Sequence, residues 1–457
     1  ILSPILSDPF QYFGFWILSC FVLQSWFGWQ LVGLTTSHPV LRGLSATFFA
    51  FSPAMIWRLH PKIGHLSLTG HFLILAGLYL CLAPSTRRHR ALAWGALLAL
   101  ASLVHAYLLV MVSVLWAASL LNRLFRQEIT LCRSLGEGLI TLGGTIFVCW
   151  IVGYFAVGNG TSLGGYGVFK ADLLTFFDAG KTDYGLWSNF LRDLPGDASH
   201  HEGFNFLGMG LLLLLPFALF SFKSHRLEAW TFFKRQPTLV ISFLLLFLYS
   251  LTHRISVGGL EFEIPVSESL LYYANIFRAS GRMVWPFYYA IILMIVILVI
   301  KGYSPRTAGI LLAVGLTIQI VDTSAGWMTV RRGMMVNPSS NWALPFGDPF
   351  WEKAALKYKK IRYVPANGTH SQLLPAFAAT HHMATDIAGL ARISADAIRL
   401  LQERAWSSVV TGHYDSEALY VMDDANFAEA QKHLNHTLDA VFRVDGFNVL
   451  APGWNAP

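Results

Sequence analysis

The sequence predicts a polytopic α-helical membrane protein that carries a small α/β domain at its C-terminal end. Of its 457 residues, 54% are hydrophobic and only 13% are charged, which excludes a soluble globular protein. The charged residues gather in short stretches between long charge-poor blocks. Beyond residue 324 the pattern changes to short apolar strands and polar helices. We therefore expect a membrane domain over residues 1–324 and a soluble domain over residues 325–457.

The charge-poor blocks predict about ten transmembrane helices, because only helices satisfy their own backbone hydrogen bonds inside a bilayer. Block 91–121 is long enough for two short helices with His105 at the turn between them, and one long tilted helix is the alternative. The chain starts at Ile1 without a basic leader segment, so we expect a further helix and loop upstream. The blocks are residues 10–32, 40–57, 66–83, 91–121, 138–157, 207–222, 238–252, 284–301 and 306–324.

Basic residues occupy alternate loops, which predicts the topology. Loops that carry an excess of Lys and Arg stay in the cytoplasm. They hold Arg42, then Arg87, Arg88 and Arg90, then Arg123, Arg126 and Arg133, then Lys223, Arg226, Lys234 and Arg235, and finally Lys301 and Arg306. The alternation requires block 91–121 to cross twice. It places residues 1–9, 58–65, 158–206, 253–283 and 325–457 on the periplasmic side of a bacterial inner membrane. The basic inner loops also explain the net charge of +7, so no nucleic-acid partner is predicted.

The C-terminal residues alternate strand and helix patterns. Short apolar strands are expected at 361–364, 418–422 and 440–444, with helices over 387–405 and 425–435. The segment is long enough for one hydrophobic core. It contains no phosphate-binding glycine loop, paired-histidine metal motif or nucleophile elbow.

Two basic groups on the predicted outer side are candidates for binding a phosphate. Arg58, His60, Lys62 and His65 precede an apolar block that contains His71. A helix start favours anions through its free N–H groups and its dipole; interfacial snorkelling of Arg58 and Lys62 is the alternative. The second group comprises Arg278 and Arg282, which are four residues apart and share one helix face. Guanidinium groups bind phosphate in a bidentate manner and stay charged.

Sugar- or acceptor-binding candidates lie in the long loop 158–206 and at the predicted turn of block 91–121. The loop carries Tyr166, Asp183, Tyr184 and Glu202. Aromatic rings stack on the apolar face of a sugar, and carboxylates accept its hydroxyl hydrogen bonds; alternatively, these acids are simply solvated. An ionisable His105 inside an apolar hairpin indicates function, although a hydrogen bond to a neighbouring helix would also explain it.

Several stretches carry a resemblance to known proteins. They are Pro9–Gly14, His65–Leu68 with His71, His105–Tyr107, Glu202–Gly208, Phe277–Arg282 with Trp285–Pro286, and Leu419–Asp424. In these stretches the chain resembles a bacterial membrane domain family of unknown function and, more loosely, the GT-C class of integral membrane glycosyltransferases. The resemblance covers most of the chain.

The resemblance implies inverting transfer of a sugar from a polyprenyl-phosphate donor to a glycan, lipid or protein acceptor. Enzymes of the class bind the lipid phosphate with Arg, Lys or His, and a carboxylate in the first outer loop acts as the base. Asp8 is the only acid of that loop in this chain, so the base is expected upstream of Ile1. The class allows a divalent metal, but the sequence contains no ligand set for one. The alternatives are a transporter or flippase of lipid-linked sugars and a non-catalytic membrane scaffold.

Overall fold

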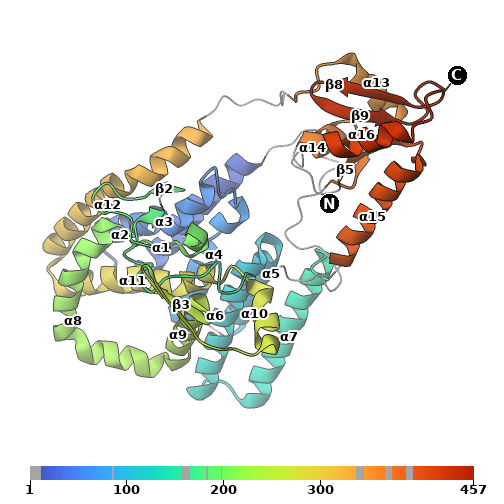
Figure 1. The fold of residues 1–457 in the computed structure, drawn as a ribbon. Coiled ribbons are helices and arrows are strands. Elements are labelled where there is room, and N and C mark those ends of the chain that lie inside the picture. Colours follow the sequence, from blue (N-terminus) through green and yellow to red (C-terminus); the bar gives the residue numbers. More distant parts are fainter. Residues whose placement is uncertain are drawn as a thin grey trace. The chain divides into compact units, whose positions relative to one another are not determined.

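The computed structural model describes residues 12–84, 87–155, 165–181, 184–196, 198–335, 344–365, 373–387 and 395–456, which form two compact units (Figure 1). The first unit is helical and contains the described residues up to 335. The second contains the described residues from 344 onward and is a small α/β region.

Each predicted apolar block forms a helix, and block 91–121 forms two. Within the described residues, seven helices are long and apolar enough to cross a membrane, and three shorter apolar helices accompany them. Helix α12 runs on past residue 324, where the sequence places the domain boundary. The helices are α1 (Phe13–Gly33), α2 (Pro39–Ala50), α4 (Phe72–Leu82), α5 (Arg87–Val104), α6 (Ala106–Phe125), α7 (Leu131–Ile151), α8 (Met209–Arg235), α9 (Pro237–Leu251), α11 (Trp285–Gly302) and α12 (Pro305–Met334).

Short elements fill the connections on one side of this unit. The short helices are α3 (Pro53–Ile56), η2 (Trp57–Leu59), η3 (Leu66–Thr69), η5 (Ala198–Gly203), α10 (Glu268–Ala274), η6 (Asn275–Phe277) and η7 (Ser280–Val284). Two antiparallel strand pairs join them, β1 (Gly180–Lys181) with β2 (Gly185–Leu186) and β3 (Arg254–Val257) with β4 (Leu260–Glu263).

The helix is interrupted at His105, between α5 and α6, as the predicted topology requires. His105 has an extended backbone, and its Nδ1 accepts a hydrogen bond from the Tyr107 N–H at 3.2 Å, which caps α6. Helices α5 and α6 run antiparallel, because Val104 and Leu108 both approach Gly70 of the α4 connection while Trp94 and Leu115 both approach Gly77. The alternative of one long tilted helix is therefore wrong.

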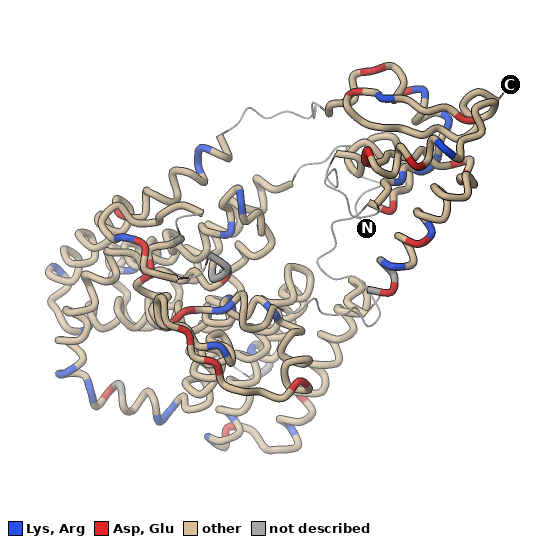
Figure 2. The backbone as a smooth tube through the Cα atoms, viewed as in Figure 1, with Lys and Arg blue, Asp and Glu red and all other residues tan. Residues whose placement is uncertain are grey.

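The loops of the helical unit alternate between two ends. At one end the predicted inner loops meet: Asn122 donates to the Arg235 carbonyl at 2.9 Å, and Lys301 pairs with Glu228 at 2.7 Å. We call this the basic end. At the other end, Trp57 donates to the His201 carbonyl at 3.0 Å, so segments 58–65 and 198–206 lie together. Most charged residues of this unit lie toward the ends of the helices (Figure 2).

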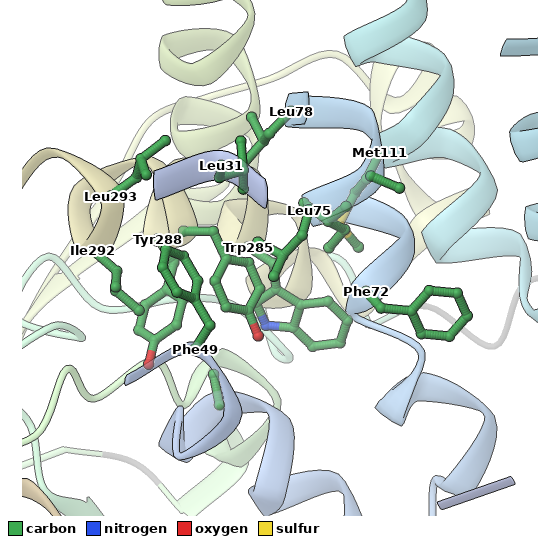
Figure 3. Close-up of a cluster of buried hydrophobic side chains, with 14 of the residues drawn as sticks. Leu31, Phe49, Phe72, Leu75, Leu78, Met111, Trp285, Tyr288, Ile292 and Leu293 are labelled. Carbon is green, nitrogen blue, oxygen red and sulfur yellow. The ribbon is translucent and has the colours of Figure 1, made fainter. Parts of the chain in front are cut away.

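The core of the unit surrounds α11, whose aromatic and aliphatic side chains meet residues of α1, α2, α4 and α6 (Figure 3). Helices α1 and α2 approach closely at Gly28, where a Cβ would stand 2.9 Å from the Phe49 ring. In contrast, α7 exposes Leu139, Ile140 and Trp150. An apolar outer surface of this kind suits lipid.

The C-terminal unit is a five-stranded sheet in the order β6-β5-β7-β9-β8, parallel at β6-β5-β7 and antiparallel at β7-β9-β8. Apolar clusters lie around Trp351 and Phe377 and around Val409 and Leu450. The three expected strands are confirmed, and β6 and β9 are additional. The elements are α13 (Pro349–Lys357), β5 (Lys360–Val364), α14 (Leu373–Thr380), β6 (Ala384–Thr385), α15 (Ala395–Thr411), β7 (Ala418–Met422), α16 (Asp424–Lys432), β8 (Ala440–Val444) and β9 (Phe447–Ala451).

Candidate functional site

A buried carboxylate, Glu202, gathers three basic side chains at the end of the helical unit opposite the basic end. Arg58 Nη1 donates to Glu202 Oε2 at 2.5 Å, and Arg282 Nε donates to the same oxygen at 2.8 Å. Arg282 Nη2 also donates to Oε1, which makes its contact bidentate. His65 Nε2 lies 3.4 Å from Oε1. We call these four residues the Glu202 cluster.

Burial and neighbouring charges determine the ionisation of Glu202 and the net charge of the cluster. The Arg58 side chain is fully buried and that of Glu202 is 6% exposed, whereas that of His65 is 44% exposed. Burial raises the pKa of Glu202, but the charges of Arg58 and Arg282, with hydrogen bonds from His65 and Arg282, hold the pKa well below its ordinary value. The carboxylate is therefore ionised at neutral pH. Two guanidinium groups share one negative charge, so the buried part of the cluster carries one excess positive charge.

Close backbone contacts explain why Glu202 and Arg282 stand in glycine-containing stretches. A Cβ on Gly281 would lie 2.6 Å from Gly203 Cα, and a Cβ on Gly203 would overlap the Lys170 carbonyl. Asn205 Nδ2 donates to the Gly203 carbonyl at 2.7 Å and closes the turn. The stretches Glu202–Gly208 and Phe277–Arg282 therefore pack directly against each other.

Aromatic rings support the guanidinium groups. Arg58 Cζ lies 5.1 Å from the ring centroid of Trp285, and Arg282 Cζ lies 4.8 Å from that of Tyr107. The Tyr107 hydroxyl accepts a hydrogen bond from the Ala279 N–H at 2.9 Å, which fixes the start of η7. None of these rings is a sequence candidate, because an aromatic residue in an apolar block looks like ordinary core.

The predicted histidines occupy different environments. His71 is fully buried against Trp285, and its Nδ1 forms a hydrogen bond of 2.6 Å with the Tyr289 hydroxyl. His60 is buried against Trp57, and burial, followed by repulsion from Lys62, lowers its pKa. Burial, followed by repulsion from Arg282, lowers the pKa of His105 to about 4, so its imidazole is neutral at pH 7. His65 is therefore the exposed histidine of the Glu202 cluster.

Arg278 differs from Arg282. Its half-buried guanidinium lies 5.9 Å from the Phe169 ring centroid and has no acidic partner among the described residues. Gly165 packs on its side chain, and the adjacent Tyr166 N–H donates to Asn275 Oδ1 at 3.0 Å. Tyr166 therefore belongs to the surroundings of Arg278. Arg278 is the one predicted arginine of this region that lacks a counter-ion in the described parts of the chain.

The remaining candidates are distributed as follows. Tyr184 stacks on His201, with the two ring centroids 4.8 Å apart, and contacts Trp57, close to the Glu202 backbone. Lys62 is exposed beside His60, to whose Nδ1 it donates through its backbone N–H at 3.3 Å. Asp8 and Asp183 lie outside the described residues. The structure thus joins Arg58, His65, Arg282 and Glu202 directly. The sequence gives no sign of this ion pairing, because Glu202 stands 144 residues from Arg58 and 80 from Arg282.

Within the described residues, no metal-binding group coincides with the Glu202 cluster, and an apolar cavity of the helical unit lies elsewhere. Across the described ranges, no group of three or more His, Cys, Asp or Glu side chains could hold a metal ion. A cavity of about 420 Å³ lies toward the basic end, lined mainly by apolar side chains of α1, α4, α8, α9 and α11 with Lys301 and Glu228. None of the predicted site residues lines this cavity.

Comparison with known proteins identifies two family matches. Residues 1–324 match the family described as "Domain of unknown function (DUF6311)", and residues 350–452 match the "DUF6311 C-terminal domain". No curated protein and no solved structure matches the chain.

Proposed function

Since the chain belongs to the DUF6311 family, whose function is unknown, we propose that it is a membrane glycosyltransferase of the GT-C type. It would transfer a sugar from a polyprenyl-phosphate donor to a glycan, lipid or protein acceptor at the periplasmic face of the bacterial inner membrane. The observation that carries this proposal is the Glu202 cluster. There an exposed histidine contacts a buried carboxylate that two arginines hold ionised.

The excess positive charge supports an anionic substrate. Arg58 and Arg282 outnumber Glu202, and the half-buried Arg278 adds a guanidinium without an acidic partner among the described residues. Cations fixed in place before the reaction stabilise the charge that grows on a departing phosphate. A lipid-borne phosphate fits this arrangement better than a neutral ligand does.

His65, predicted from the sequence to bind phosphate, becomes our candidate for the general base, in place of the upstream carboxylate that the resemblance implies. Its Nε2 faces Glu202 Oε1, so the carboxylate favours the tautomer with hydrogen on Nε2 and leaves a lone pair on Nδ1. The acceptor hydroxyl would give its proton to Nδ1 while its oxygen bonds to the anomeric carbon. The bond from that carbon to the phosphate oxygen breaks, and the lipid phosphate leaves with the electron pair. In this scheme Glu202 orients His65 and does not itself take the proton.

A reconstituted assay tests the proposal. Purified protein in lipid nanodiscs is incubated with a panel of polyprenyl-phosphate sugars and candidate acceptors, and the released lipid phosphate is quantified. His65→Ala is expected to lower turnover by about 10²–10⁴-fold, the usual contribution of a general base. His38→Ala is the matched control, because His38 is an exposed histidine between α1 and α2. Equal turnover of both variants would remove His65 from the reaction.

The same preparation separates the two alternatives. A flippase would move a fluorescent lipid-linked sugar across a liposome bilayer without releasing lipid phosphate, and a scaffold would do neither. Either result across the full donor panel would overturn the transferase proposal.

A further inference from the structure

One hairpin at the site end of the helical unit exposes its apolar face. Leu260, Phe262 and Ile264 alternate along β4 and its end and are 50–65% exposed. Their partners on β3, Val257 and Ile255, lie on the same face. Antiparallel sheets that face water on one side normally turn their apolar side chains toward the core. This hairpin does the reverse.

The charged face of the hairpin contacts the protein at Glu261, whereas Glu263 at its end is exposed. Glu261 pairs with Lys170 at 2.5 Å and with Arg254 at 2.6 Å. Ser256, which lies opposite Glu261, is buried. The Lys170 ammonium also donates to the Arg254 carbonyl. These contacts fix which face points outward, so the exposure of Phe262 is a property of the register and not of a loose loop.

The segment that follows continues the apolar surface. Helix α10 has no buried residue, and Leu270, Tyr272 and Tyr273 are exposed on it. The helix is nevertheless formed, because the Ser267 hydroxyl caps the Leu270 N–H at 3.4 Å. Asn275 anchors its end by donating to the Leu271 carbonyl at 2.9 Å. The backbone is held by polar contacts while Leu270, Tyr272 and Tyr273 remain largely exposed.

We propose that residues 260–276 form an interfacial platform whose apolar face lies in the boundary between lipid headgroups and acyl chains. The surface is continuous with lipid-facing helix: α9 exposes Leu244, Leu245 and Leu248, ends at Leu251, and leads into β3 three residues later. Paired tyrosines such as Tyr272 and Tyr273 favour the membrane interface, where the ring is apolar and the hydroxyl reaches water. An apolar face of this kind is unfavourable in water.

The platform ends beside Arg278, which has no acidic partner among the described residues. Helix α10 and η6 lead directly to this residue, so a guanidinium is held near the depth of lipid phosphates. If the proposed function holds, this arrangement lets a lipid-linked donor reach the site sideways from the membrane. The platform itself does not depend on that function, and its test requires no turnover.

Spin labelling at alternating positions of β4 tests the platform. Single cysteines are introduced as Phe262→Cys and Glu263→Cys in a Cys132→Ser background, since Cys132 is the exposed native cysteine of the described residues. The labelled proteins are reconstituted in liposomes of phosphatidylethanolamine and phosphatidylglycerol. Label accessibility is then measured to oxygen, which concentrates in lipid, and to a water-soluble nickel chelate. Tyr272→Cys on α10 provides a second position if a β4 variant fails to fold.

Labels at 262 and 272 are expected to favour oxygen over nickel several-fold, and the label at 263 to favour nickel. Equal nickel access at 262, 263 and 272 would overturn the platform by showing that the segment stands in water. Protection of 262 and 272 from both reagents would also overturn it, because protein would then cover the surface. Spin–spin broadening in that case would identify a second copy of the chain.

Discussion

The two ends of the helical unit are both rich in basic residues, yet they balance charge differently. At the basic end the buried Arg123 has an acid of its own, Glu137 at 2.6 Å, and the more exposed Lys301 pairs with Glu228 at 2.7 Å. Other cations there, such as Arg133 and Arg306, are exposed and have no acidic partner among the described residues. At the site end Arg58 and Arg282 share Glu202. Local pairing thus explains the buried charge at the basic end, and the predicted cytoplasmic position of this end explains its exposed cations. Neither explains the surplus at the site end, which is the better indicator of a ligand.

Removing the shared carboxylate should have the largest effect. Glu202→Gln leaves two buried guanidinium groups without a negative partner, and breaking a buried ion pair in this way costs about 3–5 kcal/mol. The expected result is a large fall in the midpoint of thermal unfolding in detergent, together with loss of transfer. Glu228→Gln is the control, since it removes one partner of an exposed pair and should leave the midpoint unchanged. Similar midpoints for both variants would contradict the buried arrangement.

The pH dependence of unfolding sharpens the same comparison. The pKa of Glu202 is lowered in the folded state, so its contribution to stability is present above the ordinary carboxyl pKa and is lost as pH falls through the lowered value. The wild-type midpoint should therefore decline in acid below the ordinary carboxyl range. Glu202→Gln should lack that part of the decline, and Glu228→Gln should keep it.

Removing one of the two arginines should be milder for the fold than for activity. Arg282→Ala leaves Glu202 paired with Arg58 one-to-one, so the protein is expected to express and fold. Transfer should fall by about 10²–10³-fold, the effect of losing one charge-stabilising donor. Arg282→Lys keeps the charge but not the bidentate contact, and should be intermediate. Arg306→Ala, an exposed arginine at the start of α12, is the control. Retained turnover in Arg282→Ala would remove Arg282 from the site.

The helices were predictable because charge-poor blocks are local signals. Block 91–121 shows this best, since the basic loops on either side force the break that the structure has at His105. The C-terminal strands followed from local alternation, whereas β6 is only two residues long and leaves no pattern. Among site residues, the basic groups could be chosen by type and position.

The pairing of those groups could not be predicted. Glu202 was expected to face a sugar, but its partners come from segments far away in the chain, and sequence distance carries no record of such contacts. The sequence could not predict which face of β4 points outward, for a similar reason. Alternation of Leu260, Glu261, Phe262 and Glu263 marks two faces, but only the contacts of Lys170 decide which one points outward.

The smallest effect tests the glycine contact that sets the cluster geometry. Gly281→Ala places a methyl group 2.6 Å from Gly203 Cα, where backbone and not a flexible side chain must move. Overpacking of this kind costs about 1–3 kcal/mol, and the shift should separate Arg282 from Glu202. Thermal unfolding and transfer are therefore expected to fall together. Gly144→Ala is the matched control, because a Cβ at Gly144 on α7 meets no atom within 4 Å. If Gly281→Ala behaved like Gly144→Ala, the backbones at Gly203 and Gly281 would not be in contact, and the position of Glu202 between its two arginines would need another explanation.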